Sequence, residues 1–192
     1  MKHLTSLCVA AVLLNGCGQR DEPETPAAPP AATEVTPQAQ SPTEASAQLA
    51  PTQGNGATGS LALTAVQGGV HLSGSVQGLP PNGEFGFHIH EKGDCSAPDA
   101  SSAGEHFNPT NAQHGNPTSD AHHGGDMHNV KSDAQGTAQI EVDATGVTLG
   151  TGQPDDVLGR AVVTHAKPDD YTTQPSGNSG ARVACGVITR PQ

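Results

Sequence analysis

Aromatic residues are almost absent from this chain of 192 residues, which has no tryptophan, one tyrosine and three phenylalanines. Hydrophobic residues of all kinds make up 33%, whereas glycine and proline number 24 and 16. A long-helix or coiled-coil protein is rich in alanine, leucine, glutamate, lysine and arginine, so this composition excludes that class. No apolar run reaches the roughly 18 residues that a membrane-spanning helix needs, so the sequence predicts no such helix.

Basic residues are also scarce. Lysine and arginine total 8 against 19 aspartates and glutamates, which gives a net charge of −11. A protein that binds the phosphate backbone of nucleic acid needs charge of the opposite sign, so no nucleic-acid partner is expected. Histidine, in contrast, is abundant, and eight of the ten histidines lie between His88 and His165.

The N-terminus has the features of a bacterial export signal. Residues 4–14 are mostly apolar, and this stretch is too short to span a membrane but has the length of a signal core. The segment Leu14-Asn15-Gly16-Cys17 resembles the lipobox of bacterial lipoproteins, so residues 1–16 are predicted to be a lipoprotein signal peptide and Cys17 the lipidated residue. The alternative is an ordinary cleaved signal in which Cys17 is accidental. By resemblance to the bacterial sorting rule, Gly18 favours the outer membrane over the inner one.

Residues 17–54 form a second region, composed of proline, alanine, threonine, glutamine and glutamate with almost no large apolar side chain. Such a segment cannot bury enough apolar surface to offset the entropy of ordering it. We therefore expect a disordered tether that lets a folded domain, residues 55–192, stand off a membrane anchor.

The predicted domain carries apolar residues at every second position, as Val70 and Leu72 illustrate. No window shows a helical period, and several short strands separated by glycine, proline, asparagine and aspartate indicate an antiparallel sandwich or barrel. The expected strands are 69–79, 84–91, 137–143, 160–165 and 181–188. The stretch from about 92 to 130 has no strand pattern, and an irregular segment of that length in a compact domain is usually functional.

The histidine spacing predicts metal binding. His88 and His90 are two apart in an expected strand, so their imidazoles point to one face and can hold one ion. An isolated pair of this kind could also lie exposed on a surface. Further candidates follow, however, and together they exceed what one ion needs, so two metals are inferred: four histidines suit copper, whereas three histidines and a carboxylate suit zinc. The further candidates are His106, His114, His123, Asp126 and His165.

The four cysteines divide into two groups. Cys8 lies in the predicted signal and Cys17 at its end, which leaves Cys95 and Cys185 in the exported domain. An even pair in an oxidising compartment predicts a disulfide. This bridge would attach the histidine-bearing loop to the last strand.

Six short sequence blocks stand out in the predicted domain: GFHIHE at 86–91, GEHFNP at 104–109, HGNP at 114–117, HGGD at 123–126, GRAVVTH at 159–165 and GARVACGVI at 180–188. Taken together and in this order, they closely resemble the copper, zinc superoxide dismutases of the bacterial exported kind. The resemblance covers about residues 57–190 and implies an all-β fold, a flattened antiparallel Greek-key barrel or sandwich of about eight strands with long metal-binding and active-site loops. It implies dismutation of superoxide to dioxygen and hydrogen peroxide by alternate reduction and oxidation of copper.

The resemblance also assigns roles to individual residues. His106 would ligate both metals and supply a proton during catalysis, and Arg182 would be the active-site arginine. Asp169 would link a copper ligand, His88, to a zinc ligand, His114, although a simple turn residue would also suit its sequence context. Cys95 and Cys185 match the family's intrasubunit disulfide. The implied copper ligands are His88, His90, His106 and His165, and the implied zinc ligands are His106, His114, His123 and Asp126.

Several features of the sequence allow more than one interpretation. His122 and His128 lie near the zinc ligands and are either spare ligands or solvated loop residues. The loop before Arg182 lacks the lysine that steers superoxide in eukaryotic relatives, and the scarcity of aromatic residues leaves a monomer or a homodimer equally open. A different class of function, a lipid-anchored protein that stores copper or zinc without turnover, would also explain the histidine cluster and the export signal.

Overall fold

The computed structural model describes residues 43–191, and these residues form an all-β domain. The predicted signal peptide, residues 1–16, and the lipidation site, Cys17, lie outside the described residues. Between residues 43 and 191 there is no helix long and apolar enough to cross a membrane. The elements are β1 Glu44–Pro51, β2 Thr58–Val66, β3 Gly69–Gln77, β4 Glu84–Phe85, β5 Phe87–His90, the 3₁₀ turn η1 Ser101–Ala103, β6 Val130–Lys131, β7 Ala138–Thr145, β8 Ala161–His165 and β9 Arg182–Thr189.

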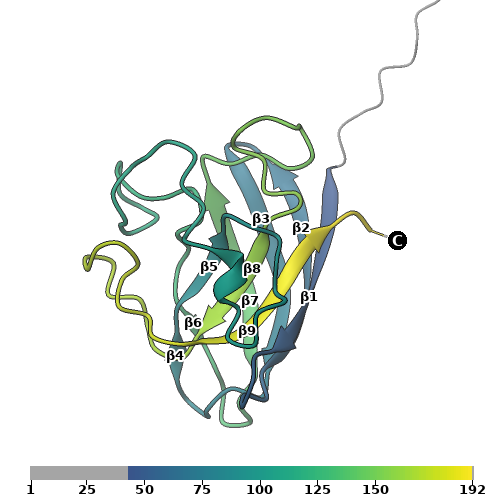
Figure 1. Cartoon of the computed structure of the whole chain (residues 1–192), viewed down its shortest axis with the longest axis vertical. Helices are drawn as coiled ribbons and strands as arrows, with labels where there is room; N and C mark the ends of the chain where they lie inside the picture. Colours follow the sequence, from purple (N-terminus) through teal and green to yellow (C-terminus); the bar gives the residue numbers. More distant parts are fainter. Residues whose placement is uncertain (1–42, 192) are drawn as a thin grey trace, which may run out of the picture. The chain divides into compact units, whose positions relative to one another are not determined.

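Seven of the strands form one antiparallel sheet in the order β5-β8-β9-β1-β2-β3-β7, and β4 pairs with β6. The sheet curls around its own inner face, as Figure 1 shows. This arrangement confirms the predicted antiparallel β fold. Because β3 pairs with β7 rather than with β4, the connection that contains β4, β5 and β6 crosses over to the other edge of the sheet.

Strand β1 corrects the predicted boundary between tether and domain. Residues 44–51 fall inside the segment that was expected to be disordered, yet they pair with β2 on one side and β9 on the other. Ala45, Ala47 and Leu49 are buried and alternate with more exposed residues. The small side chains gave β1 a tether-like composition, but a strand between two others gains its backbone hydrogen bonds from both neighbours and needs little apolar bulk of its own.

The core lies on the inner face of the curled sheet and is almost entirely aliphatic. Leu61, Leu72, Phe87 and Ile140 are fully or almost fully buried there. Burial of each such side chain stabilises the fold by about 1.5–3 kcal/mol. The alternating apolar residues from which β3, β5 and β7 were predicted are therefore the residues that fill this core.

Two long connections, the loop after β5 and the loop between β8 and β9, lie on the same side of the sheet in Figure 1. They touch through Gln174, whose side-chain oxygen accepts from the His114 amide at 3.0 Å and whose side-chain nitrogen donates to the His114 carbonyl at 2.8 Å. The predicted irregular stretch from 92 to 130 thus packs against the loop that leads into β9.

Candidate metal centre

Strand β5 positions the first two histidines at an edge of the sheet. His88 and His90 are 0% and 1% exposed, although they point away from the core side chains Phe87 and Ile89. The loop after β5 covers this second face and also pairs with the free edge of the strand. Ile89 exchanges backbone hydrogen bonds with Gly125 and Phe107 at 2.8–2.9 Å.

Gly125 is required for this close approach. A Cβ at this position would lie 2.1 Å from the Ile89 carbonyl oxygen, so any side chain would push the loop away from β5. Through the same pairing, Asp126 lies opposite His88, and His106 lies opposite His90. The loop thereby brings its own ligands to the two histidines of β5.

One group of four histidines has ligand atoms that all lie within 4.8 Å of one another: His88, His90, His106 and His165, here called the four-histidine set. Three of these rings, those of His88, His90 and His165, use one nitrogen to hold their orientation and leave the other for an ion. His90 Nδ1 donates to the Gly104 carbonyl at 2.9 Å, and His165 Nδ1 donates to the Gly180 carbonyl at 3.2 Å. Their Nε2 atoms lie 3.3 Å apart.

The second group consists of His106, His114, His123 and Asp126, here called the His/Asp set. Asp126 Oδ1 lies 2.8, 3.0 and 3.3 Å from Nδ1 of the three histidines in that order. A tetrahedral zinc site with Zn–N and Zn–O distances of about 2.0–2.1 Å has ligand atoms about 3.3 Å apart. The set is therefore close to the size that zinc needs.

Four buried ring nitrogens in the two sets have no hydrogen-bond partner: His88 Nδ1, His106 Nε2, His114 Nδ1 and His123 Nδ1. A buried polar atom without a partner is costly, and proteins retain few of them. All four belong to the ligand sets, and a bound cation would satisfy each of them. The donor atoms present thus fit one copper ion and one zinc ion that share His106.

The protonation states suit this interpretation. Burial lowers the pKa of His88, His90 and His165, and it lowers the pKa of His106 to about 4, so these rings are neutral near pH 7, as metal ligation requires. For His114, burial acts in the same direction, but the adjacent carboxylates of Asp126 and Asp169 outweigh it and raise the pKa to about 9. A bound cation would take the place of that proton.

Comparison with known proteins agrees with a site for copper and zinc. Residues 57–188, more than half of the chain, match the model of the copper/zinc superoxide dismutase family. The chain belongs to the copper/zinc superoxide dismutase family. It is similar to superoxide dismutase [Cu-Zn] 2 of Aquifex aeolicus, with 41% identity over 76% of this chain and 86% of the relative. The likeness to the extracellular superoxide dismutase [Cu-Zn] of Brugia pahangi is 41% over 61% of each chain.

Among solved structures, the dismutase domain resembles the clock protein EA4, with a TM-score of 0.70 and 42% identity over 79% of this chain and 97% of the other. The predicted copper and zinc sites are thus confirmed: the four-histidine set is the copper site of this dismutase, the His/Asp set is its zinc site, and His106 belongs to both.

The predicted disulfide is also confirmed, since Cys95 and Cys185 are bonded with a Cα–Cα distance of 5.8 Å. It joins the loop after β5 to β9. Ala100, Ala103 and Val163 pack beside it in a small apolar cluster. The bridge and this cluster fasten the loop segment that precedes His106.

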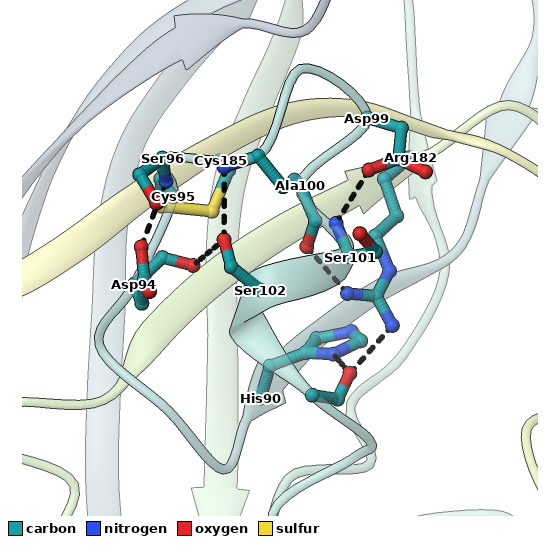
Figure 2. Close-up of a disulfide and its surroundings, with 12 residues drawn as sticks. His90, Asp94, Cys95, Ser96, Asp99, Ala100, Ser101, Ser102, Arg182 and Cys185 are labelled. Carbon is teal, nitrogen blue, oxygen red and sulfur yellow. Dashed lines mark hydrogen bonds between the residues drawn. A yellow bond between two sulfur atoms is a disulfide. The ribbon is translucent and has the colours of Figure 1, made fainter.

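Arg182, the first residue of β9, lies beside this fastened loop, as Figure 2 shows. Its guanidinium donates to the Ala100 carbonyl at 2.6 Å and to the Gly104 carbonyl at 2.5 Å. The Gly104 carbonyl also accepts from His90 Nδ1, so the arginine and a copper ligand share one acceptor. Burial lowers the pKa of Arg182, although Glu105 and Asp99 oppose the shift, and the side chain stays cationic at neutral pH.

Asp169 lies between the two metal sites and is 3% exposed. Its Oδ2 accepts from His88 Nε2 at 2.7 Å, and its Oδ1 accepts from His114 Nε2 at 3.0 Å. Burial would raise its pKa, but the hydrogen bonds from both rings outweigh burial and hold the pKa well below its ordinary value. The carboxylate is ionised and fixes one ring of each metal site.

His122 and His128, which the sequence left as either spare ligands or solvated loop residues, belong to neither ligand set. His122 Nδ1 donates to the His123 carbonyl at 2.6 Å, and its Nε2 lies 3.2 Å from Thr145 Oγ1. His128 is exposed, and its ring and the Tyr171 ring form a T-shaped pair with centroids 6.4 Å apart.

Sequence reasoning missed the groups that hold the functional side chains. The carbonyl partners of Arg182 carry no sequence signal, because every residue has a carbonyl group. Asn129 and Tyr171, which surround Asp169, had no motif or periodicity to mark them.

Proposed function

We propose that this protein removes superoxide at the bacterial cell envelope by converting it to dioxygen and hydrogen peroxide. The observation that carries the proposal is the shared ligand: His106 has one buried nitrogen in each of the two sets. A protein that only stored metal would not need to join a copper site and a zinc site through one ring.

The bound copper would supply one-electron redox chemistry, which zinc cannot supply because its oxidation state does not change. We assign proton handling to His106. Its Nδ1 lies 2.8 Å from Asp126 Oδ1 on the zinc side, while its Nε2 faces the copper side without a protein partner. A proton held at Nε2 would lie where the reduced product is formed and could be given to it.

We assign attraction of the anionic substrate to Arg182. Two carbonyl oxygens fix its guanidinium beside His90, so the charge does not need to be ordered when superoxide arrives. A fixed charge of this kind increases the local concentration of an anion and the rate at which it associates.

We assign a positioning role to Asp169, because its two oxygens hold His88 and His114 in the tautomer that leaves Nδ1 of each ring free for an ion. Partners of this type usually contribute about tenfold to a hundredfold to metal affinity or activity. Replacement by asparagine would keep the shape but lose the charge and one acceptor.

We place the protein at the envelope as a lipoprotein held through Cys17, with the tether now ending before residue 43 and the outer membrane as its site. The disulfide supports an oxidising compartment outside the cytoplasm, and an extracellular relative agrees with it. The lipobox-like segment at 14–17 supports the anchor.

Metal storage without turnover is the alternative. Among structural relatives, one is named a clock protein, so family members are not all named for dismutation. A superoxide dismutation assay on the purified protein decides between the two, with the copper- and zinc-loaded form compared with the zinc-only form. Activity confined to the copper-containing form supports the proposal, whereas no activity in either form would favour storage.

A further inference from the structure

Asp169 is held by a partner that is not a metal ligand. Asn129 and the backbone of Asp169 form two reciprocal hydrogen bonds: Asn129 Nδ2 donates to the Asp169 carbonyl at 2.9 Å, and the Asp169 amide donates to Asn129 Oδ1 at 2.8 Å. Two bonds of opposite direction fix both the distance and the rotation of the Asp169 backbone. Asn129 follows the zinc ligand Asp126 by three residues, so it connects the zinc loop to the loop after β8.

Tyr171 bonds to both residues of this pair, and Asn129, Asp169 and Tyr171 together are here called the unit. Its amide donates to Asp169 Oδ1 at 2.6 Å, the same oxygen that accepts from His114 Nε2. Its phenol oxygen accepts from the Asn129 amide at 2.8 Å. Tyr171 also has a φ of +59°, which is unfavourable for a residue with a Cβ. Its ring hydroxyl is the group that ties this turn back to Asn129.

Gly177 closes the remaining side of Asp169. A Cβ at this position would lie 1.7 Å from Asp169 Oδ1 and 2.7 Å from His114 Nε2, so the backbone of residue 177 packs directly against the pair. The carboxylate therefore has little room to rotate, and its orientation depends on the groups that hold its backbone.

We propose that Asn129 and Tyr171 are positioning residues for both metal sites. They act through Asp169, whose proposed role this inference presupposes. Their hydrogen bonds fix the carboxylate in the single orientation that reaches His88 and His114 together. Tyr171 acts through Asp169 and Asn129, because its amide donates to the Asp169 carboxylate and its hydroxyl accepts from the Asn129 amide.

The competing explanation is that Asn129 and Tyr171 only fasten two loops to each other. In that case their replacement would lower the melting temperature without changing how the folded protein binds metal. The two explanations therefore differ in metal affinity and in the copper spectrum of the folded protein, and not in stability.

The test compares Asn129→Ala and Tyr171→Phe with Thr173→Val as the matched control. Thr173→Val also removes one loop hydroxyl, which donates to Asp170 Oδ2 at 2.6 Å, but it leaves Asp169 untouched. Zinc affinity is measured by competition with a chelator, and the copper site by the electron paramagnetic resonance spectrum of the Cu(II)-loaded protein. We expect a loss of zinc affinity of about tenfold for Asn129→Ala and about threefold for Tyr171→Phe, because one or two hydrogen bonds are lost.

We also expect an altered Cu(II) hyperfine splitting in Asn129→Ala and no change of either readout in Thr173→Val. Unchanged zinc affinity and copper spectrum in both Asn129→Ala and Tyr171→Phe would overturn the inference. Since Tyr171→Phe removes a single oxygen atom, this arm remains informative if Asn129→Ala does not fold.

Asp169→Asn separates this inference from the proposal on which it rests. If Asp169→Asn weakens zinc binding and the other two variants do not, only the inference fails. If Asp169→Asn itself has no effect, both fail.

Because Tyr171 is the only tyrosine and the chain has no tryptophan, its fluorescence reports on this unit alone. Titration of the metal-free protein with zinc should change the emission, and an emission that does not respond would contradict the coupling.

Discussion

At the scale of single residues, the metal centre depends on which nitrogen each ring presents. His90 and His165 bond to carbonyl groups through Nδ1, which leaves Nε2 for the ion, whereas His88 bonds to Asp169 through Nε2 and presents Nδ1. His106 differs from all of them, because both of its nitrogens belong to ligand sets. The tautomers of His88, His90 and His165 are therefore set by a partner on the far side of each ring.

The shared ligand predicts an asymmetry between two substitutions. His106→Ala should impair copper and zinc binding together, because one donor of each set is lost. His114→Ala should mainly remove zinc, because that ring belongs only to the His/Asp set. Measurement of both metals by elemental analysis after dialysis checks this, and retention of full copper and zinc by His106→Ala would contradict the shared role.

Arg182 should act on rate rather than on metal binding. A unit charge at about 5 Å contributes roughly 1–3 kcal/mol to the attraction of an anion, which is a rate factor of about five to 150. We expect Arg182→Ile to slow dismutation by about that factor, Arg182→Lys to slow it less, and Arg182→Glu to slow it most. The measurement is the rate constant of the metal-loaded variants at several ionic strengths.

Salt provides the control for Arg182. Screening should slow the wild type more than Arg182→Ile, because only the wild type has the guanidinium charge to screen. If both respond equally and the variant loses melting temperature instead of rate, Arg182 only orders the loop segment at Ala100 and Gly104.

At the scale of elements, β1 and the loop after β5 together hold Arg182 in place. β1 pairs with β9, and Thr52, just after β1, donates two hydrogen bonds to the start of β9. Its amide donates to the Val183 carbonyl at 3.1 Å, and its hydroxyl donates to the Arg182 carbonyl at 2.7 Å. The backbone of Arg182 is thus held from β1, while its guanidinium is held from the loop.

A chain that begins at residue 55 should therefore fail to form a stable dismutase. Removal of β1 would leave β2 and β9 with unpaired edges and would expose their buried faces, because Ala45, Ala47 and Leu49 lie in the core. Thermal unfolding of chains that begin at residue 43 and at residue 55 checks this. Equal melting temperatures would show that β1 is dispensable.

At the scale of the whole molecule, the dismutase domain keeps a buried cluster of histidines in a chain with a net charge of −11. An acidic protein does not attract superoxide through its net charge, which is why we propose that the attraction is local to the metal centre and Arg182. The stability of the metal-free form, in turn, should depend on the protons that the buried histidines bind.

The metal-free protein should be most stable near pH 7. His88, His90, His106 and His165 have pKa values below 6.5 in the folded state, so the unfolded chain binds more protons and stability falls as the pH falls below about 6.5. The pKa of His114 is raised to about 9, so its contribution is present below 6.5 and is lost as the pH rises through 9. Melting temperatures at pH 5, 7 and 9 test both signs, and a higher value at pH 5 than at pH 7 would contradict the first.

The proposed lipid anchor predicts the location of the whole protein. Cys17→Ser should release the domain into the soluble periplasmic fraction or leave the signal uncleaved, with dismutase activity retained, because several acyl chains hold a lipoprotein stably whereas none remain in the variant. Membrane fractionation with an activity assay checks this. Full membrane retention of a processed Cys17→Ser protein would exclude lipidation as the anchor.

The amino-acid sequence by itself predicted metal binding, the disulfide and the class of fold. The spacing of His88 and His90 in a strand indicated a metal site, and Cys95 and Cys185 are the cysteines that remain after the export region. The division of the ligands between copper and zinc came from the resemblance of the six sequence blocks to the family. The alternation of apolar residues around Leu72 and Ile140 likewise reflects a sheet that buries one face. Successive side chains of a strand point to opposite faces, so this pattern can be read within each strand without knowledge of its neighbours.

Only the tertiary structure decided the features that depend on contacts between distant segments. β1 has too little apolar bulk to be recognised in isolation and becomes a strand because β2 and β9 flank it. The carbonyl partners of Arg182 and the unit of Asn129, Asp169 and Tyr171 join segments 40 or more residues apart. Backbone groups and loop side chains of this kind have no period in the sequence, because their partners are chosen by how the two long loops pack together.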